Sequence, residues 1–147
     1  MEALADSVRE ATPCRVGSSL HSKEVQLRKP NSIMRRYAQT ILLKDDPELI
    51  RQYVDYHAHP WPEIAEGMRN SGVQRAYIYR VGLVMFMIVE TDEDAKGPGL
   101  SEATQARLNE WDVLMQGFQE AMPGLPADAP RNGKWTLMEE IYTFEQN

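Results

Sequence analysis

The residues best suited to chemistry lie together between Tyr53 and Glu63, a stretch of eleven residues with two histidines, two tyrosines and a tryptophan. Tyr53 and His57 are four residues apart, so on a helix they project from one face, one turn from each other. A histidine gives and recovers a proton near neutral pH. Pro60 predicts a break in the helix just after His57, which places the imidazole at the end of an element, where pockets form.

The same stretch offers a metal-site alternative. His57 and His59, with Glu63 four positions further on, match the His-x-His plus Glu spacing of metal-binding cupins and would imply an iron or manganese enzyme. Cupin ligands lie on strands, whereas here a helix precedes and prolines interrupt. The pattern therefore disfavours a metal, and His59, between alanine and proline, is more typical of a structural residue.

Composition limits the classes of partner. The chain has 147 residues, and 16 basic against 22 acidic side chains give a net charge of −6, which opposes binding to nucleic acid or anionic membranes. The longest apolar run, residues 83–89, is too short to cross a bilayer. One cysteine, Cys14, excludes an internal disulfide; it fits a reducing compartment, and a secreted protein without disulfide bridges almost as well. We expect a soluble, cytoplasmic protein.

Two regions differ in pattern. Residues 1–33 have mixed charge, no sustained apolar periodicity and no signal-peptide core, and are predicted to form a flexible tail. Its low acidic bias and the basic residues Arg15, Lys23, Arg28 and Lys29 leave an organellar transit peptide as an alternative. Residues 34–147 are predicted to form a single domain.

Strands and helices alternate along that domain. Residues 36–43 are rich in strand formers, and Asp46 and Pro47 then provide an N-cap and a first helical position. The helix is predicted to continue irregularly to Met68 and to stop at residues 70–72. Residues 73–80 and 83–91 are predicted to pair as a hairpin.

The second half repeats the order. After a loop over 92–99, Ser101 can cap a helix whose apolar residues recur at steps of three and four. Residues 123–134 are predicted to be loop and residues 135–145 a last strand. The order β-α-β-β-α-β predicts an α+β, ferredoxin-like fold with both helices on one face of an antiparallel sheet. The hairpin strands are apolar on both sides, so a second copy is expected to cover the open face, giving a homodimer joined through its sheets.

The spacing of these residues resembles the L-rhamnose mutarotases. The resemblance runs from about residue 35 to 145 and rests on Tyr53, His57, the string Trp61-Pro62-Glu63, and a strand that ends Tyr77-Ile78-Tyr79. It implies a dimeric α/β barrel, no cofactor, and interconversion of the α and β anomers of a six-carbon deoxy sugar. It also implies that His57 is the proton donor and that Tyr53 binds sugar.

Two positions depart from the family's pattern. A tyrosine that binds substrate in the family falls on Ala76 here, and the neighbouring Tyr77 should point to the opposite face of its strand. Of two adjacent family tryptophans only Trp111 is present. The loops at 92–99 and 123–134 also look longer than is usual for the family.

Mutarotation opens a cyclic hemiacetal and needs only proton transfers to the ring oxygen and from the anomeric hydroxyl. Opposite His57 we expect Glu139, because it shares a face of the last strand with apolar residues; Glu63 and Tyr79 are alternatives. Trp61 and Trp111 would pack against the C–H face of a sugar, and Tyr53 and Tyr79 would offer hydroxyls to its alcohols.

Each of these residues also has a structural interpretation. His57 could cap a helix, Trp111 could be ordinary core, and Glu139 could join a salt bridge. On the same fold, a cofactor-free monooxygenase or a non-catalytic module that binds a small metabolite are the remaining alternatives.

Overall fold

Six strands and three α-helices follow one another within residues 33–147, the part of the chain that this computed structural model describes. The predicted tail, residues 1–33, lies outside the described residues apart from Ile33. No helix in the described part is both long and apolar enough to cross a bilayer. The elements are β1 (Met34–Leu43), α1 (Pro47–Ala58), α2 (Pro62–Asn70), β2 (Val73–Val81), β3 (Val84–Asp92), the 3-10 turn η1 (Glu93–Ala95), α3 (Glu102–Gln116), β4 (Gln119–Glu120), β5 (Arg131–Asn132) and β6 (Trp135–Leu137).

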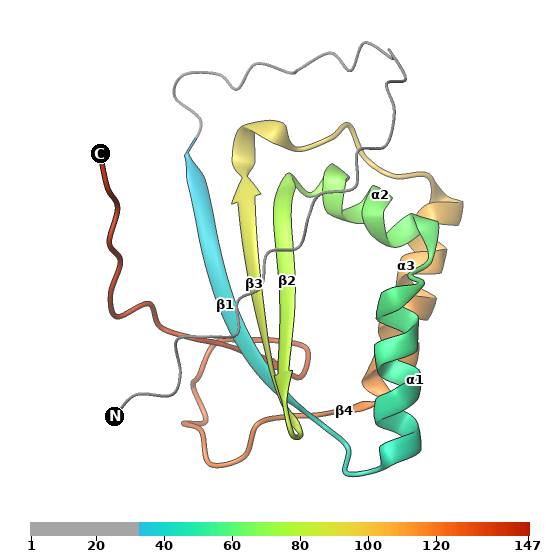
Figure 1. Ribbon diagram of the computed structural model, residues 1–147. Coiled ribbons are helices and arrows are strands. Elements are labelled where there is room, and N and C mark those ends of the chain that lie inside the picture. Colours follow the sequence, from blue (N-terminus) through green and yellow to red (C-terminus); the bar gives the residue numbers. More distant parts are fainter. Residues whose placement is uncertain (1–32) are drawn as a thin grey trace, which may run out of the picture.

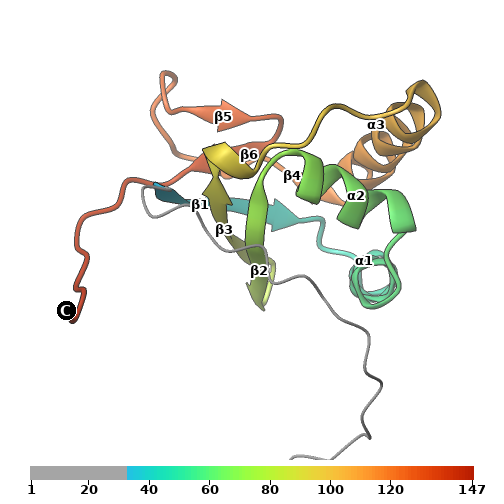
Figure 2. The same ribbon diagram turned by 90° about the horizontal axis from the view of Figure 1, so that it is seen from above.

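The strands form one antiparallel sheet in the order β2-β3-β1-β6-β5, with β4 beside the end of β1. The three helices gather on one side of it (Figures 1 and 2). The central order β6-β1-β3-β2 is that of a ferredoxin-like fold, so the predicted α+β class is confirmed.

Local chemistry explains where α1 begins and ends. The Asp46 carboxylate accepts hydrogen bonds from the backbone N–H groups of Glu48 and Leu49, at 2.9 and 3.3 Å, and Pro47 takes the first turn, where no N–H is needed. Pro60 lies in the break and Pro62 begins α2. The predicted irregular helix is therefore two helices, because proline cannot donate the bonds that would continue the first.

Two glycines make the turns into and within the hairpin. Gly72 has φ +79°, and a Cβ added there would stand 2.3 Å from the carbonyl oxygen of Asp92. Gly82, between β2 and β3, has φ +57° with open space around it. Both turns therefore require the left-handed region, but only Gly72 also allows a close approach of two backbones.

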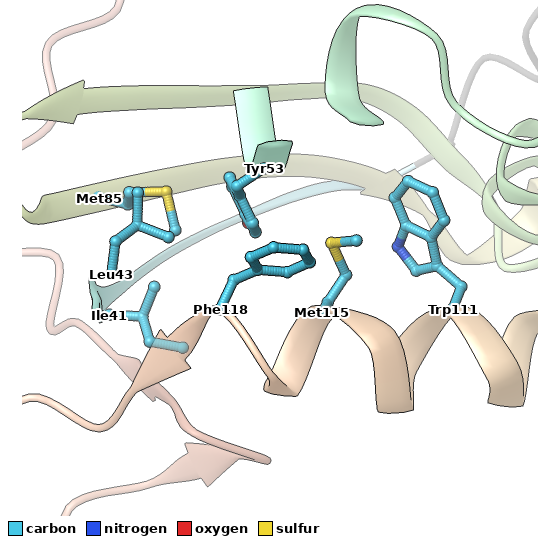
Figure 3. Packing of buried hydrophobic residues seen from close by; sticks show 7 residues of the cluster. All are labelled: Ile41, Leu43, Tyr53, Met85, Trp111, Met115 and Phe118. Atoms are coloured by element: carbon cyan, nitrogen blue, oxygen red, sulfur yellow. The ribbon is translucent and has the colours of Figure 1, made fainter. Parts of the chain in front are cut away.

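The sheet register assigns side chains to its two faces. Ile41 of β1 lies opposite Met85 of β3, and both pack with Tyr53 of α1 in the main core. Figure 3 shows the complete cluster: Ile41, Leu43, Tyr53, Met85, Trp111, Met115 and Phe118. Residues two apart on a strand share a face, so Gln39, Met87 and Ala76 also belong to this side, which we call the helix face. The alternate residues form the open face.

Helix α3 carries the other half of the core. Ser101 accepts the Thr104 N–H at 3.1 Å, which confirms the predicted cap. Thr104, Trp111 and Met115 of the predicted stripe are buried in α3, and Phe118 is buried just after its end. The apolar period of this helix thus predicted correctly which side faces the sheet.

The prediction of a long last strand is wrong. β6 covers only Trp135–Leu137, and one further sheet bond, from Met138 N–H to the Ala38 carbonyl, ends the pairing. Beyond it Ile141 is 89% exposed. Strand-forming composition indicates an ability to pair, but a strand forms only where a neighbouring strand lies alongside. The two-residue strands β4 and β5 were not predicted, since so short a pairing leaves no pattern in the sequence.

Candidate active site

Tyr53 is the most deeply buried residue of the candidate site. The residue is 3% exposed on the sheet side of α1, and its hydroxyl accepts a hydrogen bond from Gln119 Nε2 at 3.3 Å. Burial raises the pKa of this phenol. Gln119 lies in β4, which pairs with the end of β1. The Tyr53 hydroxyl is therefore hydrogen-bonded inside the core, and its ring packs against the rings of His57 and Phe118.

His57 lies one turn further along α1, with its ring centroid 4.3 Å from that of Tyr53. Its Nδ1 is 2.8 Å from the Tyr53 backbone carbonyl. A carbonyl oxygen can only accept, so Nδ1 carries the hydrogen and Nε2 is left to exchange protons. Desolvation lowers the pKa of the imidazole, although the residue as a whole is exposed. The two observations agree because one side of the ring packs on aromatic side chains while the other is open.

A row of rings continues from His57. Its centroid lies 5.7 Å from Trp111, and Trp111 lies 5.2 Å from Trp61, both at steep interplanar angles. Trp111 is 8% exposed, so most of it is core. Trp61 is half-buried. Edge-to-face contacts of this kind fix the orientation of each ring by means of the next.

Arg107 of α3 ends the row. Its guanidinium carbon lies 3.8 Å from the Trp61 ring centroid, and its Nε lies 3.9 Å from a carboxylate oxygen of Glu63. A cation over an indole face is a favourable contact, and it holds the start of α2 against α3. Arg107 was missed at the level of sequence, where it is one of many charged residues on an amphipathic helix.

The two remaining predicted site residues are not brought to this row within the described chain. Tyr79 pairs with Phe86, which places it on the open face beside Tyr77, at a ring distance of 6.5 Å. Glu139 follows the end of β6 and is exposed. The expectation that Glu139 shares a strand face with Trp135 and Leu137 is wrong, because the strand ends before it.

The metal-site alternative is not supported by the geometry. His59 approaches Asp55 at 3.6 Å, while Glu63 approaches Arg107. Among residues 33–147 no three histidine, cysteine or acidic side chains gather closely enough to hold a metal ion.

Comparison with known proteins decides the family. The family model for L-rhamnose mutarotase matches residues 36–144, which is nearly the whole of the described part. This chain is an L-rhamnose mutarotase family member.

Individual proteins are also similar to this chain. An L-fucose mutarotase of Xanthomonas campestris pv. campestris is 33% identical over 117 residues, covering 77% of this chain and 90% of the relative. A protein of Dictyostelium discoideum is 32% identical over 114 residues, covering 74% and 89%. The crystal structure of an L-rhamnose mutarotase from Formosa agariphila superposes with a TM-score of 0.51 at 18% identity, covering 76% of this chain and 99% of that one. It supports the fold. The predicted family and the predicted enzyme class, a carbohydrate mutarotase, are confirmed.

Ala76 and Tyr77 lie on opposite faces of β2. Ala76 lies opposite Val89 on the helix face, whereas Tyr77 lies opposite Ile88 on the open face. The prediction that these neighbours point to opposite faces is confirmed. Tyr77 therefore cannot take the place of a side chain at position 76 in the same chain.

Elsewhere in the described part of this mutarotase there are open hollows, two of which are as follows. One is lined by residues between the end of α2 and the start of α3, including Asn70, Leu100 and Gln105, and the other runs along α3 near Val113. Neither includes His57 or Tyr53. The candidate site is thus described by its aromatic row and by the exposed side of His57.

Proposed function

We propose that this mutarotase interconverts the α and β anomers of L-rhamnose or a related deoxy hexose, with His57 exchanging the protons. The observation that carries the proposal is His57 itself, with Nδ1 held on the Tyr53 carbonyl and Nε2 without a hydrogen bond to any of residues 33–147, in a chain of the L-rhamnose mutarotase family. The family relative named for L-fucose supports a deoxy sugar as the class of substrate.

The tautomer suits both directions of the reaction. In the opening step, neutral Nε2 takes the proton of the anomeric hydroxyl, the bond from C1 to the ring oxygen breaks, and a proton passes to that oxygen. Both oxygens are bonded to C1, so one nitrogen can serve each in turn. A lowered pKa makes the imidazolium the stronger acid, which helps it to release the proton. Rotation about the C1–C2 bond then presents the other face of the aldehyde, and the ring closes by the reverse steps. The chemistry requires no cofactor.

The aromatic row provides the binding surface in this proposal. Trp61, half-buried and backed by Arg107, offers a flat apolar ring beside the Trp111 edge and His57. The C–H face of a pyranose packs on such surfaces. Glu139 does not belong to this arrangement in a single chain, so we assign the proton transfers to His57.

We further propose that the protein is a cytoplasmic homodimer joined through the open faces of its sheets. Tyr77, Tyr79 and Val81 on that face are 44%, 58% and 68% exposed. Beyond β6, Ile141, Tyr142 and Phe144 are 89%, 79% and 74% exposed. Large apolar side chains exposed on a sheet face and on a terminal segment are typical of surfaces that a partner covers.

The experiment is a measurement of anomer exchange by saturation-transfer NMR. The wild-type protein should accelerate exchange between the anomers of L-rhamnose, L-fucose or both beyond the rate in buffer alone. Line broadening of the sugar without faster exchange would favour the non-catalytic binding module. No effect on any deoxy hexose would contradict the proposed substrate class.

A further inference from the structure

One polar side chain in the middle of the sheet has a buried atom without a partner. Gln39 is 5% exposed at the centre of β1, and its Oε1 accepts no hydrogen bond from any residue in the range 33–147. A buried amide oxygen that has lost water and gained no donor lowers the stability of the fold. Such a group needs an explanation, and a ligand that supplies the donor is one.

The residues directly opposite Gln39 supply no donor. On the helix face it lies between Met87 of β3 and Leu137 of β6, directly opposite each. The next residue on the same face toward the core is Ile41. All three side chains are apolar, and the two donors on the same face, Tyr37 of β1 and Trp135 of β6, make no hydrogen bond to Oε1.

Gln39 and His57 occupy corresponding positions on the two elements that enclose the core. β1 runs toward Leu43, and α1 then runs in roughly the opposite direction (Figure 1). Ile41 and Tyr53 pack in the same cluster. From Ile41, two residues of strand lead back to Gln39, a step of about 6.6 Å. From Tyr53, four residues of helix lead to His57, a step of about 6 Å in the same direction. Gln39 and His57 therefore both lie beyond the core cluster, on the same side of it.

The helix face becomes accessible at this level. Tyr37, two residues further along β1, is 39% exposed, and Leu137, opposite Gln39, is 36% exposed. A ligand that reaches His57 from the open side would thus come to the end of the Gln39 side chain, whose own torsions let the amide turn toward it.

We propose that Gln39 is a sugar-binding residue whose Oε1 accepts a hydrogen bond from a hydroxyl of the substrate bound at His57. The inference rests on the proposed function. The chemistry favours a neutral polyol because an amide oxygen among methionine, leucine and isoleucine accepts from an alcohol but has no charge to attract an ion. Gln39 thereby determines which sugar hydroxyl is oriented toward the helix face.

Gln39→Met tests this, because methionine has nearly the same length and volume without an acceptor of comparable strength. The variant should unfold at a higher urea concentration than the wild type, since an unpaired buried amide is removed. Its half-saturating sugar concentration in the NMR exchange assay should rise about three- to tenfold, as expected for the loss of one hydrogen bond. A structural glutamine would give the opposite change in stability.

Thr136→Val is the matched control. Thr136 is 4% exposed with its Oγ1 also unpaired, and it lies opposite Thr40 on the open face. This variant should gain stability and keep the half-saturating concentration unchanged.

The outcomes separate the two proposals. Wild-type protein without exchange activity would contradict the proposed function. An active wild type with Gln39→Met and Gln39→Leu both at its half-saturating concentration would overturn the inference alone. A loss of stability in both variants would also overturn it, because Gln39 would then be a structural residue.

Discussion

At the scale of single residues, the account depends on how His57 is held. The residue types predicted a proton-transfer histidine beside a phenol, and the spacing of four predicted their shared helix face. The structure adds the tautomer, because Nδ1 donates to the Tyr53 carbonyl. It also adds the cause of the lowered pKa, which is desolvation on the aromatic side of the ring. Neither can be obtained from residue types, since both depend on distances.

The pH dependence of exchange follows from that pKa. Burial disfavours the imidazolium, so neutral His57 persists below the ordinary value of 6.5. The acid limb of the exchange rate, measured by NMR between pH 4 and 8, should therefore have its midpoint below about 6.5. His59→Ala should leave that midpoint unchanged, since His59 lies beside Asp55 at the exposed end of α1. A midpoint at or above 6.5 would show that His57 is not desolvated.

The same shift affects stability with a definite sign. Between the folded pKa and about 6.5 the unfolded chain binds the proton of His57 more readily than the folded one. Above that window His57 does not make stability depend on pH. As the pH falls through the window, the free energy of unfolding decreases, because the unfolded chain takes up the proton first.

Other site residues could not be identified in the sequence for physical reasons. Gln119 reaches the Tyr53 hydroxyl only because β4 pairs with the end of β1, and Arg107 reaches Trp61 only because α2 packs on α3. Gln39 appears as an ordinary polar residue of a strand until its missing partner is seen. Such contacts join distant segments and have no local spacing.

At the scale of elements, the hairpin of β2 and β3 and the turn at Gly72 that precedes it form part of the sheet on which the helices pack. Capping residues, proline positions and the apolar period predicted α1 and α3. Strand-forming residues bounded by turn residues predicted β1, β2 and β3. All of these signals are local in the sequence. The last strand was overestimated because composition cannot indicate where a neighbouring strand ends. Glu139 was assigned to the site on the strength of that overestimate.

Gly72→Ala tests the closest contact between elements. The variant should lower the free energy of unfolding by about 3 kcal/mol, because a Cβ would meet the Asp92 carbonyl at 2.3 Å as well as require φ +79°. Gly82→Ala is the control, with φ +57° and nothing within 4 Å, and should cost about 1 kcal/mol from the backbone alone. Urea unfolding of both measures the difference. Equal losses would show that the approach at Gly72 is not as close as the structure has it.

At the scale of the whole molecule, one face of the sheet is covered by helices, and the other exposes large apolar side chains along β2. Tyr77 and Tyr79 stack there, near a small charged group in which Glu90 contacts Arg36 at 3.2 Å and Arg75 at 3.6 Å. A second copy would bury the tyrosines, while the charges form a rim.

Tyr77→Lys tests the proposed dimer. At a twofold interface the substitution places two ammonium groups near each other in a region that loses water, so the protein should become monomeric. Val113→Lys is the control, since Val113 is 71% exposed on α3, away from the sheet. Sedimentation equilibrium should give a dimer for the wild type and for the control. A monomeric wild type, or a dimeric Tyr77→Lys protein, would contradict this interface.

The central claim is that the His57 imidazole catalyses sugar ring opening, and the most direct test is anomer exchange by His57→Ala. Saturation-transfer NMR on L-rhamnose should show exchange reduced to the rate in buffer, while the circular dichroism spectrum and the urea midpoint show that the fold is retained and His59→Ala keeps wild-type exchange. Exchange at the wild-type rate by a folded His57→Ala protein would contradict the account.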